Sequence, residues 1–80
     1  MGIKEDIGLR IRTMRQSRQM TQEDLAREIN LMGMEITPLI ISRIEKNTRH
    51  VCDGELLALS KALKVSMEWL CGEGDITITK

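Results

Sequence analysis

The sequence predicts an all-α domain built from five short helices. Apolar residues recur every three or four positions along most of the 80-residue chain, which is the period of an amphipathic helix. Ser, Thr or Asp precedes four of these stretches, at the position where a helix N-cap is expected. The large apolar residues are mainly Ile, Leu and Met, with one Trp and no Phe or Tyr. Leu and Met favour helices over sheets, so the core is expected to consist of aliphatic side chains on packed helices.

Two predicted helices occupy the first part of the chain. Three apolar side chains fall on one face of a helix over residues 4–18: Ile7, Ile11 and Met14. Thr21 is the predicted N-cap of the second helix, whose first turn is acidic, as the helix dipole favours. The apolar face of this second helix consists of Leu25, Ile29 and Met32. Gly33 provides its C-terminal stop.

A third helix follows closely. Thr37 is its predicted N-cap, and Pro38 occupies the first helical position, where the missing N–H has no cost. Ile41 and Ile44 face inward, and the helix is expected to end at residues 47–48.

Two further helices complete the prediction. Asp53 is expected to cap the fourth, whose apolar face recurs at helical spacing: Leu56, Ala58, Leu59, Ala62 and Leu63. Ser66 is expected to cap a short fifth helix that contains Met67 and Leu70 and is closed by Gly72 and Gly74.

The last residues, 75–80, alternate apolar and polar side chains with the period of a strand. A lone strand cannot satisfy its own backbone hydrogen bonds, so it either pairs with another chain or stays an unpaired terminus. Pairing with its copy about a two-fold axis would give a homodimer, to which Leu57 and Trp69 could add apolar surface. We therefore expect one domain, residues 1–74, and a tail, residues 75–80, that is a candidate dimerisation strand.

Several classes of protein are excluded or disfavoured. No apolar run approaches the roughly 18 residues of a membrane span. The N-terminus lacks the basic-then-apolar order of a signal peptide, and the two cysteines form no disulfide framework. We therefore expect a cytoplasmic protein without a membrane partner.

Residues with metal-binding or catalytic chemistry do not form a recognisable motif. His50, Cys52 and Asp53 are close in sequence and Cys71 is a fourth potential ligand, but the paired short spacings of a zinc site are absent. A Cys–His nucleophile would need an orienting group and a pocket, and five short helices offer little concavity. We expect no metal, no cofactor, no small-molecule ligand and no enzymatic activity.

The charge of the chain is balanced but unevenly distributed. The sequence has 12 basic and 12 acidic residues and a net charge of zero. Residues 1–49 hold nine basic and seven acidic residues, a net charge of +2, and residues 50–80 hold three and five, a net charge of −2. Nucleic-acid-binding proteins usually carry a basic excess. This distribution does not exclude such a function, but it predicts weak non-specific binding.

Several motifs, taken together and in this order, resemble the phage-repressor/Cro-like (XRE-type) helix-turn-helix domains. They are Arg10-Ile11-Arg12 with Arg15, Thr21-Gln22-Glu23-Asp24-Leu25-Ala26, Ile41-Ser42-Arg43-Ile44-Glu45, Leu63-Lys64-Val65-Ser66, and Trp69-Leu70. The resemblance covers about residues 7–72. It implies a five-helix, lambda-repressor-like fold in which the helices starting at Thr21 and Thr37 form the DNA-binding pair.

The resemblance implies a set of DNA contacts: Thr21, Gln22, Thr37, Leu39, Ser42, Arg43, Lys46, Asn47, Thr48 and Arg49. The second helix of the pair, the recognition helix, would enter the major groove of double-stranded DNA with its N-terminal residues at the base edges. Gln22 matches a family position that contacts phosphate, at a helix N-terminus that suits an anion. Residues 46–49 match a segment that runs along the DNA backbone. Arg15 and Glu45 match a family pair that bridges the first helix to the end of the recognition helix.

Two features depart from the family pattern. The first is the connection within the helix pair, where relatives usually place three or four residues. Ala26 and Ile41 are separated by several residues more than this. Either the first helix of the pair is a turn longer, or the connection is a larger loop sealed by Met34 and Ile36.

The second departure is the apolar start of the recognition helix. Pro38, Leu39 and Ile40 stand where Gln, Ser or Arg is common. Apolar side chains cannot make bidentate contacts to bases, although Leu39 could touch a thymine methyl group. Alternatively, Leu39 and Ile40 pack against the long connection. Arg43 is then the best candidate for reading a base, with guanine N7 and O6 as its partners.

The sequence therefore predicts a sequence-specific DNA-binding transcriptional regulator, a repressor that acts by occupancy and binds a palindromic operator as a dimer. The alternative is a protein-interaction or antitoxin-like module that uses the same scaffold, with the apolar tip of the third helix as its docking patch.

Overall fold

The computed structural model describes the backbone of residues 3–71 and the side chains of residues 7–71. This part of the chain contains five helices: α1 (Ile3–Ser17), α2 (Gln22–Leu31), α3 (Pro38–Glu45), α4 (Asp53–Leu63) and α5 (Met67–Leu70). The all-α prediction is confirmed, and each predicted helix is present. The predicted strand at residues 75–80 and the predicted stops at Gly72 and Gly74 lie outside the described residues.

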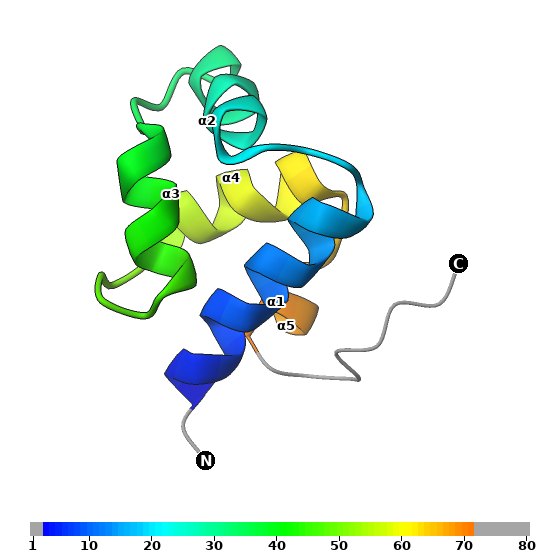
Figure 1. The fold of residues 1–80 in the computed structure, drawn as a ribbon, viewed down its shortest axis with the longest axis vertical. Coiled ribbons are helices and arrows are strands. Elements are labelled where there is room, and N and C mark those ends of the chain that lie inside the picture. The colour runs from blue at the N-terminus through cyan, green and yellow to red at the C-terminus, as the bar shows by residue number, and fades with distance from the viewer. Residues whose placement is uncertain (1–2, 72–80) are drawn as a thin grey trace.

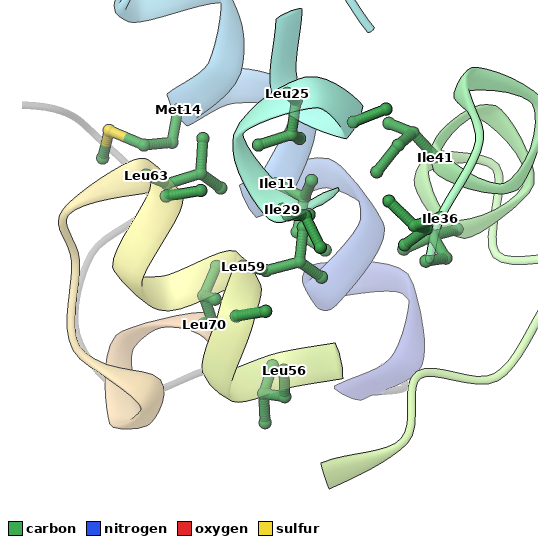
Figure 2. Close-up of a cluster of buried hydrophobic side chains, with 14 residues drawn as sticks. Ile11, Met14, Leu25, Ile29, Ile36, Ile41, Leu56, Leu59, Leu63 and Leu70 are labelled. Carbon is green, nitrogen blue, oxygen red and sulfur yellow. The ribbon is translucent and has the colours of Figure 1, made fainter. Parts of the chain in front are cut away.

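The helices surround a single core (Figure 1). α1 packs against α3, α4 and α5, and α2 packs against α3 and α4. Eight side chains are almost completely inaccessible to solvent: Ile11, Leu25, Ile29, Ile41, Ile44, Leu59, Leu63 and Leu70. Figure 2 shows α1, α2 and α4 meeting at Ile11, Ile29 and Leu59. Because the core consists of aliphatic side chains from all five helices, no single helix pair accounts for its stability.

Three predicted N-caps are confirmed by their hydrogen bonds. Thr21 Oγ1 accepts from the N–H of Asp24, and Asp24 Oδ2 accepts from the N–H of Thr21, both at 3.0 Å. The bond from the Thr21 backbone is the main reason that the pKa of Asp24 lies below its usual value of 3.8. Thr37 Oγ1 accepts from Ile40 N at 3.2 Å, and Ser66 Oγ accepts from Trp69 N at 3.0 Å. These bonds satisfy backbone donors that a helix start would otherwise leave unpaired.

The predicted cap of α4 is wrong by one residue. Cys52 is the N-cap, and Asp53 is the first residue of the helix. Glu55 Oε1 accepts from the backbone N–H of Cys52 at 3.1 Å. A carboxylate three positions after the cap can reach back in this way whatever residue stands at the cap. Asp53 instead contributes its charge to the first turn, where the helix dipole favours it.

The connection between α2 and α3 is a six-residue loop over residues 32–37. Ile36 is buried and Met34 is half-buried, so the larger loop sealed by these residues is the alternative that the structure adopts. Asn30 Oδ1 accepts from the N–H of Ile36 at 2.9 Å, and Gly33 has a φ of 97°, which favours glycine. Met32 was expected on the inner face of α2 but is 44% exposed. The helix ends at Leu31, so the chain turns before Met32 can point inward, and Ile36 supplies apolar volume to the core instead.

A close approach of α1 to the end of α3 depends on Gly8. A Cβ atom at Gly8 would lie 2.6 Å from the carbonyl oxygen of Glu45 and 2.8 Å from that of Ile44. Both atoms belong to the backbone, so a larger side chain at this position would have to displace α3. Gly54, in the first turn of α4, has more space, because a Cβ atom there would meet only the flexible end of Met34, at 3.4 Å.

Gly8→Ala should therefore lower the free energy of unfolding, by about 1–3 kcal/mol, even though Ala is the better helix former. Urea denaturation followed by circular dichroism measures this change. Gly54→Ala is the matched control, because the same methyl group meets no backbone there and should leave the stability unchanged or raise it by up to about 1 kcal/mol. Equal effects of the two substitutions would contradict the steric explanation.

Candidate nucleic-acid interface

α3 has one buried face and one exposed face. Ile41 and Ile44 are buried in the core. Leu39, Arg43 and Lys46 recur at helical spacing on the opposite side, and all three are exposed. No ion pair among the described residues involves Arg43 or Lys46. We call these three side chains the outer stripe of α3. It runs from an apolar first turn to a cationic C-terminal end.

The first turn of α3 offers little hydrogen-bonding capacity. Thr37 is exposed, but its hydroxyl is held at the helix start by the cap bond to Ile40. Pro38 has no N–H, and Leu39 is 57% exposed. Ile40 packs partly against the core, whereas Leu39 is a large apolar side chain of this turn that remains exposed.

A buried cluster holds the C-terminal end of α3. Arg15 Nε donates to Glu45 Oε2 at 2.6 Å, and Arg15 Nη2 donates to Glu45 Oε1 at 3.1 Å. The two side chains are only 10% and 4% exposed. Arg15 Nη1 also donates to the carbonyl of Met20 at 2.8 Å. The pair that the family resemblance implies therefore joins α1 to α3 through a bidentate contact, and it also fixes the turn before α2.

Gln22 extends this cluster to the start of α2. Its Nε2 donates to Glu45 Oε1 at 3.2 Å, and the side chain is half-buried. The contact places the N-terminus of α2 beside the C-terminus of α3. Thr21 is exposed next to it. Free backbone N–H groups at a helix start suit an anion, and Gln22 is oriented there by Glu45.

The segment after α3 is less available than the sequence suggested. The hydroxyl and the N–H of Thr48 both donate to the carbonyl of Arg43, at 3.1 and 2.9 Å, and so terminate the helix. Asn47 has a φ of 61° at this turn. Lys46 is exposed, and Ser42 is half-buried. The structure thus brings Gln22 to the C-terminal end of α3, and the other sequence-predicted residues of this segment differ in how far their polar groups are already hydrogen-bonded.

Arg49 forms an ion pair with Glu55, a contact that was not predicted from the sequence. Its Nη1 lies 2.9 Å from Glu55 Oε1, and the two side chains are 33% and 13% exposed. The same nitrogen also donates to the carbonyl of His50 at 3.2 Å. The hydrogen bond from Arg49 is the main reason that the pKa of Glu55 lies below its usual value of 4.5. The capping-box position of Glu55 was the available signal, because a carboxylate that folds back over its N-cap also faces the preceding loop.

Two other arginines have structural partners outside the interface. Arg18 Nε donates to the carbonyl of Leu63 at 2.6 Å, at the end of α4. Arg10 is buried, with its guanidinium 4.8 Å from the ring centroid of Trp69 and its Nη1 2.8 Å from the Trp69 carbonyl. One part of the Trp69 ring is therefore in cation–π contact with Arg10. This leaves less apolar surface for the homodimer contact that the sequence predicted for Trp69.

Two further observations concern other kinds of site. The described residues contain no cluster of three His, Cys, Asp or Glu residues that could hold a metal ion. No helix in this part of the chain has the length and hydropathy to cross a membrane.

This arrangement defines a helix-turn-helix protein. The sequence matches the family described as Helix-turn-helix over residues 11–70, so the chain belongs to this family, in its XRE-type form. It is accordingly a DNA-binding domain of the transcription-regulator type. Comparisons with curated proteins and with solved structures return no match.

The buried cluster predicts a non-additive effect on stability. Glu45→Ala leaves Arg15 buried without its carboxylate and should cost on the order of 3–5 kcal/mol of unfolding free energy. The double substitution Arg15→Met with Glu45→Leu removes both charges and should cost less than Glu45→Ala alone. Urea denaturation of the three proteins measures the difference. A double variant that is less stable than the single one would show that the pair contributes through its own attraction rather than through the cost of an unpaired charge.

The Arg49–Glu55 pair predicts a dependence of stability on pH. Because folding lowers the pKa of Glu55, its contribution is fully present above the unfolded value of about 4.5 and is lost as the pH falls through the lower folded value. Glu55→Gln should therefore be less stable than wild type at pH 7 and should lose less stability between about pH 5 and 3.

The measurement is the unfolding free energy as a function of pH, from urea titrations. Glu28→Gln is the control, because Glu28 is exposed on α2 and has no hydrogen bond among the described residues. It should follow the wild-type profile. A Glu55→Gln profile parallel to the wild type would refute the assigned role of the pair.

Proposed function

We propose that this protein is a sequence-specific transcriptional regulator that binds a palindromic operator as a homodimer and represses by occupying it. The observation that carries the proposal is the outer stripe of α3, which is exposed along its length while its opposite face is anchored in the core. A recognition helix needs this combination, because base contacts require a fixed docking geometry.

Each part of the interface has a role in the proposal. Arg43 is the candidate for guanine, whose N7 and O6 accept a bidentate guanidinium. Gln22 and the α2 N-terminus approach one phosphate strand, together with Thr21. Lys46 approaches the phosphate backbone of the DNA from the end of α3, with Asn47 and Thr48 beside it. Thr37 and Ser42 each offer one hydroxyl to a base or a phosphate. Arg49 reaches phosphate only if it exchanges its bond to Glu55.

The dimer is part of the proposal because a single domain offers few contacts. The chain has a net charge of zero, so the long-range attraction to DNA is weak. Two domains on half-sites about 34 Å apart double the number of contacts on one face of the duplex. Leu57 on α4 is 43% exposed and offers apolar surface for a partner copy. In this proposal residues 1–74 form the binding domain, and the tail over residues 75–80 is a candidate dimerisation strand.

One observation supports a second candidate function, the docking of another protein. Leu31 at the end of α2 and Met32 at the start of the following loop are 76% and 44% exposed, and Leu39 is exposed at the start of α3. Exposed apolar residues on both sides of the same loop could form a protein-binding patch. A titration of a fluorescent random duplex at about 50 mM salt separates the two functions, because electrostatic binding to DNA is strongest at low salt. No binding under these conditions would favour the docking module.

Arg43 and Lys46 should have different effects on binding. On a duplex selected from a random pool, Arg43→Ala should cost about 1–3 kcal/mol of binding free energy and relax the preference at one base pair. Lys46→Ala should weaken all duplexes alike and reduce the slope of log K against log salt by about 1.

Lys61→Ala is the matched control for charge, since Lys61 is exposed in the last turn of α4 and is not part of the outer stripe of α3. It should leave both the affinity and the salt slope close to wild type. If Arg43→Ala behaves as Lys61→Ala does, α3 is not the recognition helix. Analytical ultracentrifugation of the free protein and of the complex then tests the dimer.

A further inference from the structure

We propose that the first turn of α3 identifies a pyrimidine by its 5-methyl group, through Leu39, within about two base pairs of the guanine that Arg43 contacts. This inference rests on the proposed function and adds the chemistry that the operator must present.

The first observation is that the Leu39 side chain is not buried in the fold. The sequence is compatible with two positions for this side chain, packed against the long α2–α3 connection or exposed to solvent. Ile36 of this connection is buried in the core, and Leu39 is still 57% exposed. Ile40 is the residue of this turn that packs partly on the core. The loop therefore does not cover Leu39.

The second step is the chemistry of the neighbouring groups. Pro38 has no N–H, and Thr37 has one hydroxyl that is already an acceptor in the helix cap. None of the side chains at residues 37–40 has the two parallel polar groups that bidentate contact to adenine or guanine requires. If this turn reads a base, it does so through apolar contact.

The third step is the complementary surface on DNA. Among the groups at the edges of unmodified base pairs in the major groove, the thymine 5-methyl is the apolar one. 5-Methylcytosine carries the same group at the same ring position. A leucine side chain against this methyl removes apolar surface from water, whereas against any other edge it would desolvate polar groups without pairing them. The shared chemistry is the 5-methyl group, whichever of the two bases supplies it.

The position of this base follows from the geometry of α3. Leu39 and Arg43 are four residues apart on the outer stripe, which corresponds to about 6 Å along the helix axis. Successive base pairs are spaced by about 3.4 Å. The methyl-bearing pyrimidine therefore lies about two base pairs or less from the guanine.

The experiment uses the full chain and a duplex selected from a random DNA pool. Each thymine is replaced in turn by deoxyuridine, which lacks only the 5-methyl group, and Kd is measured. Wild type should lose about fourfold in affinity at one thymine per half-site, the value expected for one buried methyl group. That thymine should lie within about two base pairs of the position whose preference Arg43→Ala relaxes.

The sources of the methyl group are distinguished at this same position. Cytosine and 5-methylcytosine, each paired with guanine, are compared there. A gain of about fourfold on methylation shows that the methyl group is sufficient, and both bases are then ligands. A preference for thymine over deoxyuridine without any gain from methylcytosine restricts the ligand to thymine, which still supports the role of Leu39.

Protein variants assign the effect to Leu39. Leu39→Ala should bind the thymine and deoxyuridine duplexes with equal affinity. Leu31→Ala is the matched control, because Leu31 is exposed on α2, outside the outer stripe of α3, and the substitution removes the same apolar groups. It should keep the wild-type ratio. Both residues are exposed, so folding is expected to persist, and circular dichroism checks it.

Three results would overturn the inference. The first is an absence of sensitivity to deoxyuridine and to methylcytosine near the Arg43 position. The second is a Leu39→Ala variant that keeps the wild-type ratio. In both, specific DNA binding remains and the proposed function stands. The third is an absence of binding to any duplex at low salt, which rejects the proposed function together with this inference.

Discussion

The bidentate contact between Arg15 and Glu45 is the constraint on which the interface depends. Aliphatic contacts hold the helices together but are tolerant of small shifts, because they have no direction. The ion pair has a direction, and it joins α1 to the last residue of α3. Through Gln22 and the carbonyl of Met20 the same cluster also fixes the start of α2. A buried pair of this kind adds little net stability, and its contribution is better understood as setting the relative positions of three helices.

The close contact at Gly8 and the loop between α2 and α3 complete this arrangement. Gly8 allows α1 to touch the backbone of α3 at the residue that carries the ion pair, so the C-terminal end of α3 is held from two directions. The N-terminal end is held differently, by the buried Ile36 and the cap at Thr37. The longer loop therefore does not leave α3 loosely attached. It changes which apolar residues are exposed beside the helix, because Leu31 and Met32 remain outside the core.

Much of the fold could be predicted from the sequence because its signals are local. Thr21, Thr37 and Ser66 act within three residues, and the inward faces of α3 and α4 follow from their period alone. The cap of α4 was misplaced by one residue even though its signal is local, and two other errors concern residues whose environment the local pattern does not set. Met32 lies beyond the point where the helix ends, and its period could not reveal that end. Arg49 looked like a free cation, since its partner Glu55 stands six positions later and faces it only once the α3–α4 loop has folded. Of the candidate site, the two helices that carry it and the Arg15–Glu45 pair could be predicted, but not which side chains already have partners within the fold.

Several of the basic residues behind the balanced net charge already have partners within the fold. Arg10, Arg15, Arg18 and Arg49 all have partners within the fold, where they cap helices, pair with carboxylates or stack on Trp69. The cations left on the outer face of α3 are Arg43 and Lys46. If α3 is the recognition helix, as we propose, so few cations limit the attraction to phosphate, and a larger share of the binding energy is expected from contacts that depend on the base. An apolar side chain at the start of the proposed recognition helix would suit this situation, because an apolar contact does not weaken with salt as a phosphate contact does. In the proposed interface, the neutral composition and the apolar tip are therefore consistent features, because specificity would replace electrostatic affinity.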